Sequence, residues 1–163
     1  MRKKVSTVRY WLFKSEPDAF SISDLARTRA VLWDGVRNYQ VRNLLRDEIR
    51  EGDRALFYHS STKEVGVVGE MAVVGGAVTD PLQFDPKSQY YDPKSTKEAP
   101  RWLAVTVRYV RTFPRLVPLP LLRTDPALSG MQILERGNRL SITAVTKAQY
   151  DRIIRLGTKA HGG

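Results

Sequence analysis

Apolar side chains recur at helical spacing in three segments of the chain. Between residues 41 and 49 they occupy positions i, i+3, i+4 and i+8, which predicts a helix with these residues on one face: Val41, Leu44, Leu45 and Ile49. Gly52 is expected to end this helix. A shorter helix is predicted after Ser21 or Ser23, either of which can act as its N-cap. Thr146 and Gln149 match a capping box, so a C-terminal helix is expected to begin there and to turn three side chains inward: Tyr150, Ile153 and Ile154.

Strands are predicted where the chain is continuously apolar or alternates between apolar and polar positions. Residues 8–14 and 55–59 are predicted strands, and residues 64–79, rich in valine and glycine, predict one long bent strand or two strands with a bulge. Alternation over 103–109 and again over 140–144 predicts two more. Strands and helices follow one another irregularly, without β-α-β repetition. This order indicates the α+β class, with the strands in a small mixed barrel flanked by helices.

Composition excludes several classes of function. The chain has 163 residues, a length that suits one domain, and it contains no cysteine and two histidines, His59 and His161. Thiol catalysis, disulfides and zinc sites built on cysteine or several histidines are therefore excluded. No apolar run approaches the ~18 residues of a membrane helix, and no apolar core follows the basic start as in a secretory signal. We expect a cytoplasmic monomer, associated with the nucleoid in a bacterium or nuclear in a eukaryote.

Positive charge is concentrated in the C-terminal part of the chain. Lysine and arginine number 27 against 17 acidic residues, a net charge of +10, and residues 99–163 contain eleven basic and three acidic residues. Such a concentration favours an anionic partner, nucleic acid before an acidic membrane. The alternative is that the charge only keeps a small protein soluble. We predict a basic tail over residues 1–9, a single domain over 10–157 and a short tail over 158–163.

Residues that could perform catalysis are not arranged for it. Ser60 and Ser61 adjoin His59, but neighbours on a strand point to opposite faces and cannot act as nucleophile and base. The sequence contains no Gly-x-Ser-x-Gly, no phosphate-binding loop and no Gly-x-Gly-x-x-Gly. We therefore predict a protein without enzymatic activity, cofactor or metal.

Aromatic side chains stand beside hydrogen-bonding groups in three segments, residues 10–17, 33–40 and 57–60. A planar heterocycle needs this combination, because it offers a face for stacking and donors and acceptors for the edge. Aromatic residues fill cores more often than they bind ligands, and we expect four of them to do so: Trp11, Phe13, Phe57 and Trp102. Trp33 differs, because it lies beside Asp34 at a predicted turn, where packing alone explains a large aromatic side chain less easily.

Five motifs occur in the order found in one family: KSEP at 14–17, WDGVRNYQ at 33–40, FYHS at 57–60, YYDP at 90–93 and RGNRLS at 136–141. Together they resemble the EVE domain family, over nearly the whole chain. The resemblance implies a PUA-like fold, a bent β-barrel flanked by helices, and kinship with the YTH domains that read N6-methyladenine in RNA. It also implies a non-catalytic reader of a modified, methylated base in DNA or RNA.

The resemblance further implies a pocket for the base. Nine residues are expected to line it, from the end of the first strand, the start of the second helix and the end of the strand at 55–59: Lys14, Ser15, Glu16, Trp33, Arg37, Asn38, Gln40, Tyr58 and His59. Trp33 is the expected stacking wall, so that its replacement by alanine should abolish base-specific binding with little loss of stability.

Some of these residues also have structural interpretations. Ser15 and Asn38 could instead be ordinary caps of a turn or helix. Arg37 could clamp a phosphate or pair with an acidic neighbour, Asp34 in particular. Glu16 and His59 could serve structural hydrogen bonds.

The nucleic-acid backbone is expected to meet the basic C-terminal region, and three arginines of the strand beginning at 103 are the candidates: Arg108, Arg111 and Arg115. Two other functions stay open from the sequence. One is an RNA-binding PUA-like module without preference for a modified base, and the other is a sensor of a free nucleotide metabolite.

Residues 80–100 contain four prolines and predict a long loop. Tyr90 and Tyr91 are adjacent, so in an extended segment at least one of them should lie near the surface. Two roles are possible for the pair. They could border the pocket and hold the flanking nucleotide, or they could pin the loop to the barrel.

Overall fold

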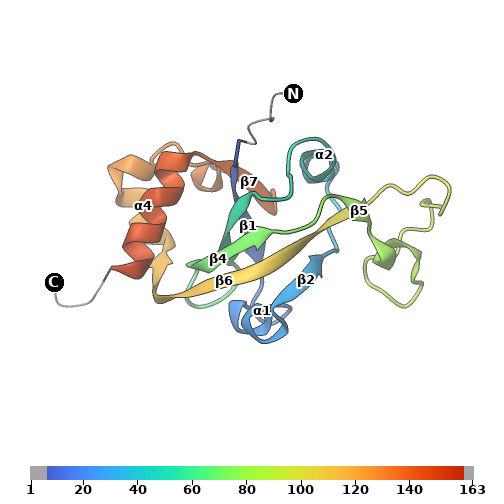
Figure 1. The fold of residues 1–163 in the computed structure, drawn as a ribbon, viewed down its shortest axis with the longest axis horizontal. Coiled ribbons are helices and arrows are strands. Elements are labelled where there is room, and N and C mark those ends of the chain that lie inside the picture. Colours follow the sequence, from blue (N-terminus) through green and yellow to red (C-terminus); the bar gives the residue numbers. More distant parts are fainter. Residues whose placement is uncertain (1–6, 160–163) are drawn as a thin grey trace, which may run out of the picture.

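The structure, a computed structural model, describes residues 7–159 (Figure 1). Its seven strands form one sheet, in the order β2-β6-β4-β3-β1-β7 with β5 paired to β6. The strands are β1 (Tyr10–Ser15), β2 (Ala30–Trp33), β3 (Arg54–His59), β4 (Gly66–Val73), β5 (Val78–Thr79), β6 (Leu103–Pro118) and β7 (Ile142–Val145). β1 and β3 are parallel and every other pair is antiparallel, so the sheet is mixed as predicted. β2 and β7 end the strand order, so the sheet is not closed.

Four α-helices and three short 3-10 helices complete the described chain: α1 (Ile22–Thr28), α2 (Tyr39–Asp47), α3 (Leu119–Thr124), α4 (Lys147–Thr158), η1 (Pro81–Phe84), η2 (Pro126–Leu128) and η3 (Gln132–Leu134). The capping box predicted at Thr146 and Gln149 exists in α4, and Ser21, one of the two predicted N-caps, forms a second box with Asp24 in α1. The reciprocal bonds satisfy amide groups that the first turn of a helix leaves unpaired. The α+β class and the positions of the main helices are confirmed.

Two apolar clusters lie on opposite faces of the sheet. Side chains of a strand alternate between its faces, so on β1 Trp11 and Phe13 belong to one cluster and Leu12 to the other. The first cluster is covered by α1 and α2, and the second by α3 and α4 (Figure 1). The four aromatic residues predicted for the core are buried, three of them completely and Trp102 with 5% of its surface exposed.

Several boundaries differ from those predicted from the sequence. α2 ends at Asp47, five residues before Gly52. Ile49 lies beyond the end of the helix and is nevertheless buried. β2 was not predicted, since its four residues carry no alternation of their own and pair with β6. Residues 64–79 form two strands, β4 and β5, which was one of the two alternatives.

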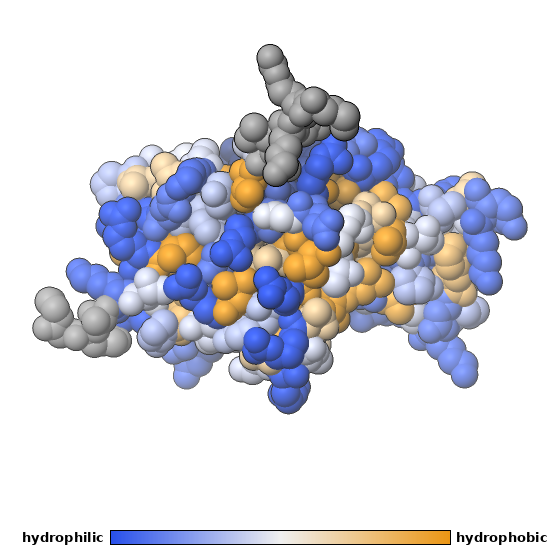
Figure 2. Space-filling model, viewed as in Figure 1, coloured by the Kyte–Doolittle hydropathy of each residue, from blue (hydrophilic) through white to orange (hydrophobic). Residues whose placement is uncertain are grey.

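β6 is much longer than the predicted strand at 103–109, because it bends at register shifts against β4 and continues to Pro118. It pairs with β2, β4 and β5 and so connects most of the sheet. In Figure 2 apolar residues gather between hydrophilic ones over the middle of the visible face, where β4 and β6 lie.

The predicted tails lie largely outside the described residues. Of residues 1–9, the last three are described, and Arg9 is held by an ion pair of 3.0 Å with Glu48 and by a backbone bond to the Asp53 carboxylate. Of residues 158–163, Thr158 is the last residue of α4. None of the helices within residues 7–159 is long and apolar enough to cross a membrane.

Candidate functional site

The carboxyl ends of β1 and β3 bring several of the predicted residues together. The two strands are parallel and in register, with Lys14 opposite Tyr58 and Ser15 opposite His59. Parallel strands end at the same edge of a sheet, so the KSEP and FYHS motifs meet there although more than forty residues separate them. This edge is the candidate site.

Strand alternation divides these four residues between the two faces. Ser15 and His59 lie on the face covered by α1, where the Ser15 hydroxyl donates to the Phe20 carbonyl at 2.6 Å and the Ile22 amide donates to Nε2 of His59 at 3.1 Å. Each side chain therefore makes the structural hydrogen bond that the sequence allowed as an alternative. Both remain partly exposed, so each keeps hydrogen-bonding capacity for a ligand.

Trp33, at the end of β2, lies on the same face as Ser15 and His59. Three phenylalanine rings contact the indole nearly edge-on, with centroids 5.3 Å (Phe13), 6.2 Å (Phe20) and 5.5 Å (Phe57) from it. Its exposed fraction is 9%. Packing thus explains this tryptophan, contrary to the argument from its position at a turn. Little of the indole surface is therefore open to a ligand.

Lys14 and Tyr58 lie on the other face, since Tyr58 packs in the cluster of Leu12 and Leu56. Burial lowers the pKa of the Lys14 ammonium and raises the pKa of the Tyr58 phenol, whose rise is opposed by the nearby Arg123 guanidinium. Two of the nine predicted residues are therefore separated by the sheet from Trp33, and a single pocket does not contain the whole set.

The start of α2 holds three further predicted residues. Asn38 is the N-cap, and its side-chain oxygen accepts from the Val41 amide at 3.0 Å. Gln40 is exposed in the first turn. Glu16 belongs to the KSEP motif, where it directly follows β1 and is exposed. Gln40 and Glu16 make no side-chain hydrogen bond or ion pair within residues 7–159, which leaves both available to a ligand.

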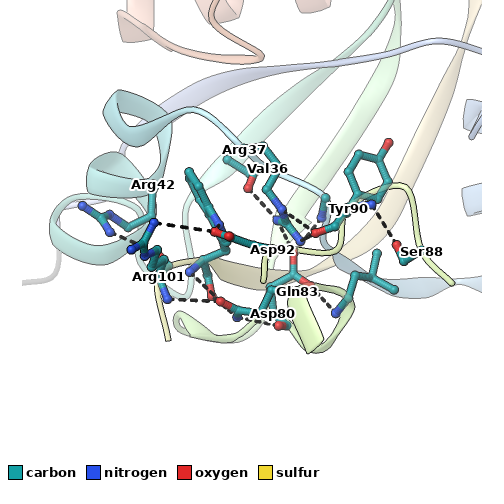
Figure 3. Close-up of polar contacts among 12 residues, drawn as sticks. Val36, Arg37, Arg42, Asp80, Gln83, Ser88, Tyr90, Asp92 and Arg101 are labelled. Atoms are coloured by element: carbon teal, nitrogen blue, oxygen red, sulfur yellow. Dashed lines mark hydrogen bonds and ion pairs between the residues drawn. The ribbon is translucent and has the colours of Figure 1, made fainter. Parts of the chain in front are cut away.

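Arg37 is engaged with the loop of residues 80–101 (Figure 3). Its guanidinium pairs with the buried Asp80 carboxylate at 2.9 Å and donates twice to the Tyr90 carbonyl, at 2.9 and 2.8 Å. The partner is thus Asp80 and not Asp34. Burial raises the pKa of the Asp34 carboxyl, and the negative charge of Asp80 raises it further.

The same loop is fixed to the domain by buried hydrogen bonds. The Gln83 side chain donates to the carbonyls of Asp80 and Trp102 and accepts from the Trp102 amide (Figure 3). Tyr90 packs against Gly35, whose φ of +82° suits glycine and where a Cβ would lie 3.1 Å from the ring. Tyr91 is 42% exposed, which confirms that one of the two tyrosines lies near the surface. For Tyr90 these contacts favour the pinning role.

The three arginines predicted to contact phosphates occupy different situations on β6. Arg108 is exposed. Arg111 pairs at 2.9 Å with Glu70, a buried carboxylate that also accepts from the Tyr150 hydroxyl. Burial and this hydrogen bond raise the pKa of Tyr150. Arg115 is exposed and also interacts with another group of the protein. Arg111 therefore has a structural partner, and its removal would leave Glu70 poorly paired.

Protonation of His59 should make the free energy of unfolding depend on pH. Burial lowers its pKa, and its Nε2 accepts from the Ile22 amide, so protonation breaks that bond. The folded-state pKa lies below the unfolded value, so the unfolded chain takes up the proton first and stability falls as the pH drops below about 6.5. Urea unfolding between pH 7.5 and 5.5 should show this loss, and His59→Gln should reduce it. An equal pH dependence in the variant would contradict the assignment.

No group of three or more histidine or acidic side chains suitable for a metal ion occurs in the described part of the chain. The groups gathered at the strand ends are the small exposed part of Trp33, a hydroxyl, an imidazole and a few exposed polar side chains. They suit stacking and hydrogen bonding to a planar ligand.

The fold is of the α+β class, with one mixed sheet flanked by helices and with polar groups at the ends of a parallel strand pair. The EVE domain family model matches residues 9–156. Thymocyte nuclear protein 1 of Homo sapiens is 38% identical over 169 residues, which cover 92% of this chain and 74% of that protein. The chain belongs to the EVE domain family, and the resemblance read from its motifs is confirmed.

Solved structures agree with this assignment. A hypothetical protein from Leishmania major has 42% identity and a TM-score of 0.89, over 93% of this chain and 95% of that one. The human THYN1 protein in complex with 5-methylcytosine-containing DNA has 38% identity and a TM-score of 0.86, over 93% of this chain and 99% of that one. The PUA-like fold implied by the resemblance is therefore confirmed.

Proposed function

We propose that this protein is a non-catalytic module, active as a monomer, that binds nucleic acid and holds a modified base at the carboxyl ends of β1 and β3. The observation that supports this most directly is the likeness to the human THYN1 protein, which was solved with DNA containing 5-methylcytosine. The base is expected to lie against the small exposed part of Trp33, between Ser15, Glu16 and His59. Gln40 and Asn38 approach from the start of α2.

Energetics decide what such a site needs. Stacking one base on an aromatic side chain contributes roughly 1–3 kcal/mol, with little dependence on which base it is. One buried methyl group adds about 0.8 kcal/mol, or about fourfold in affinity. A preference for the methylated base well above fourfold therefore requires polar groups at the base edge, because their loss of a partner on binding the wrong base is costly. Ser15, Glu16 and His59 are the groups placed for this.

The proposal is tested by fluorescence anisotropy with short oligonucleotides that differ only in one 5-methylcytosine. We expect the methylated strand to bind more than about fourfold tighter than the unmodified one, which exceeds what the methyl group contributes alone. Glu16→Gln should reduce this preference, because Glu16 is exposed at the site. Glu51→Gln is the matched control, since Glu51 is exposed before β3, at the opposite end of that strand.

The same measurement separates the rival functions. An RNA strand bound as well with or without a modified base would support a module that recognises RNA structure. A free neutral ligand, such as a nucleoside, that binds tightly and without salt dependence would support a metabolite sensor. Equal affinity for modified and unmodified strands of both kinds would contradict the proposal.

A further inference from the structure

A groove of about 630 Å³ lies beside the candidate site, on the face that carries Lys14 and Tyr58. It is lined by Arg123 of α3, by Ser129, by Ile133 and Leu134 of η3, and by residues 135–138, which include the start of the RGNRLS motif. Its polar side chains are Arg123, Ser129, Glu135, Arg136 and Asn138. None of the nine residues predicted for the base lines it.

A backbone hydrogen bond attaches one wall of this groove to β1. The Lys14 amide donates to the Ser141 carbonyl at 2.8 Å, which attaches the end of the RGNRLS motif to the end of the strand. Asn138 shapes the turn, because its side chain donates to the Gln132 carbonyl at 2.7 Å and accepts from the Leu140 amide at 2.9 Å. The turn before it passes through Gly137, with a φ of +79°. The groove is therefore a defined feature of the fold.

The charged side chains of the groove have no hydrogen-bonded or ion-paired partner in the described part of the chain. Within residues 7–159, the side chains of Arg123, Arg136 and Glu135 form no hydrogen bond or ion pair, and both arginines are exposed. Arg111, by contrast, is paired with Glu70. Two arginines that face a groove without a partner can each give charge-assisted hydrogen bonds to a phosphate. Glu135 opposes them, and its charge would weaken the binding of an anion.

We propose that this groove binds the phosphate backbone of the nucleic-acid strand whose base occupies the candidate site. The inference rests on the proposed function. Arg123 is near Tyr58, whose register partner is Lys14, so the groove and the site share the end of the β1–β3 pair. The groove lies on the face opposite Trp33, so a strand whose base is held at the site would pass around the ends of β1 and β3 to bring its adjoining phosphates to the groove. Backbone contacts give affinity without sequence preference.

The experiment measures the salt dependence of binding for the double variant Arg123→Gln, Arg136→Gln. Each lost phosphate contact should flatten the log–log slope by roughly 0.7–0.9. The double variant should thus lose about 1.4–1.8 of slope, equivalent to roughly 25- to 60-fold weaker binding at 0.1 M salt if the lines meet near 1 M. Methylated and unmodified oligonucleotides should weaken by the same factor. The melting temperature should stay unchanged, because both side chains are exposed and unpaired.

Two further variants make the result specific. Lys87→Gln, Lys97→Gln removes the same charge from the loop of residues 80–100, which lies at the other end of the molecule in Figure 1, and should leave the slope nearly unchanged. Glu135→Gln should strengthen binding several-fold at low salt, the opposite direction, because it removes a negative charge from the groove.

The outcomes distinguish the two proposals. A wild-type slope in the arginine variant, an equal loss in the lysine control, or unchanged binding with Glu135→Gln would overturn the groove as a phosphate site. A flattened slope in a protein that shows no preference for the methylated strand would support the groove and contradict the reading of a modified base. Failure of the wild-type protein to bind either oligonucleotide would overturn both.

Discussion

Replacement of Trp33 by alanine should lower the stability of this protein substantially. The indole is 9% exposed and contacts Phe13, Phe20 and Phe57, so its removal opens a cavity in the core on the α1 face. Substitutions of this kind cost roughly 3–5 kcal/mol. In a domain of this length that corresponds to a fall in melting temperature of roughly 6–20 °C. Thermal unfolding measures it.

The matched control for this change is Tyr91→Ala, which removes an aromatic side chain that is 42% exposed. It should change stability by about 0.5 kcal/mol or less. Trp33→Phe, which keeps an aromatic ring in the cluster, is the variant suited to binding measurements. A melting temperature unchanged in Trp33→Ala, together with lost base preference, would restore the expectation drawn from the sequence, that Trp33 serves the ligand and not the core.

Replacement of Asp80 by alanine should have an effect of similar size, by a different mechanism. The Asp80 carboxylate is completely buried and accepts from the Gly35 amide at 2.8 Å, the Leu82 amide at 2.7 Å and Arg37 at 2.9 Å. Its removal leaves two amides and one guanidinium without their acceptor. Breaking such a buried pair costs roughly 3–5 kcal/mol, and the partial exposure of Arg37 places the expected loss at the lower end.

The Asp80 replacement should also loosen the loop of residues 80–101 in particular, because Asp80 joins this loop to the turn after Trp33. Amide hydrogen exchange should show faster exchange at Asp92 and Ser95, whose amides are bonded within that loop. Asp85→Ala is the control, an exposed carboxylate in the same loop that accepts only from the Lys87 amide, with an expected cost of about 1 kcal/mol or less. Unchanged exchange in Asp80→Ala would show that the loop is held by Gln83 alone.

The parts of the fold that the sequence predicted correctly depend on short-range signals. Ser21 with Asp24 and Thr146 with Gln149 lie within one turn of each other, so the capping boxes form from neighbours in the chain. Phe13 and Phe57 are buried, because apolar runs on central strands leave no other place for them. β2 and the far half of β6 were missed, since partners distant in the sequence define them.

The candidate site was predicted in part. Motif order located the ends of β1 and β3, and the structure places Lys14, Ser15, Tyr58 and His59 there. The motifs place Lys14 and Ser15 next to each other in the chain, but strand alternation sends their side chains to opposite faces of the sheet. Adjacent motif residues on a strand therefore do not form one rim.

The acidic partners of Arg37 and Arg111 could not be predicted from the sequence. The pairing of Arg37 with Asp80 spans 43 residues, and that of Arg111 with Glu70 spans 41. Asp80 before Pro81 did mark a helix start, and Asp80 is the N-cap of η1. Its second role, as the acceptor for Gly35 and Arg37, depends on where the loop folds back.

The sequence by itself determined the α+β class, the family, the main elements and the strand ends that form the candidate site. These follow from local periodicity, caps and motifs, which depend on residues near one another in the chain. The tertiary structure alone decided that Trp33 is a core residue, that Arg37 and Arg111 have buried acidic partners, and that Arg123 and Arg136 face a groove without any. Burial and pairing are set by long-range packing, because a side chain's surroundings come mostly from segments far away in the sequence.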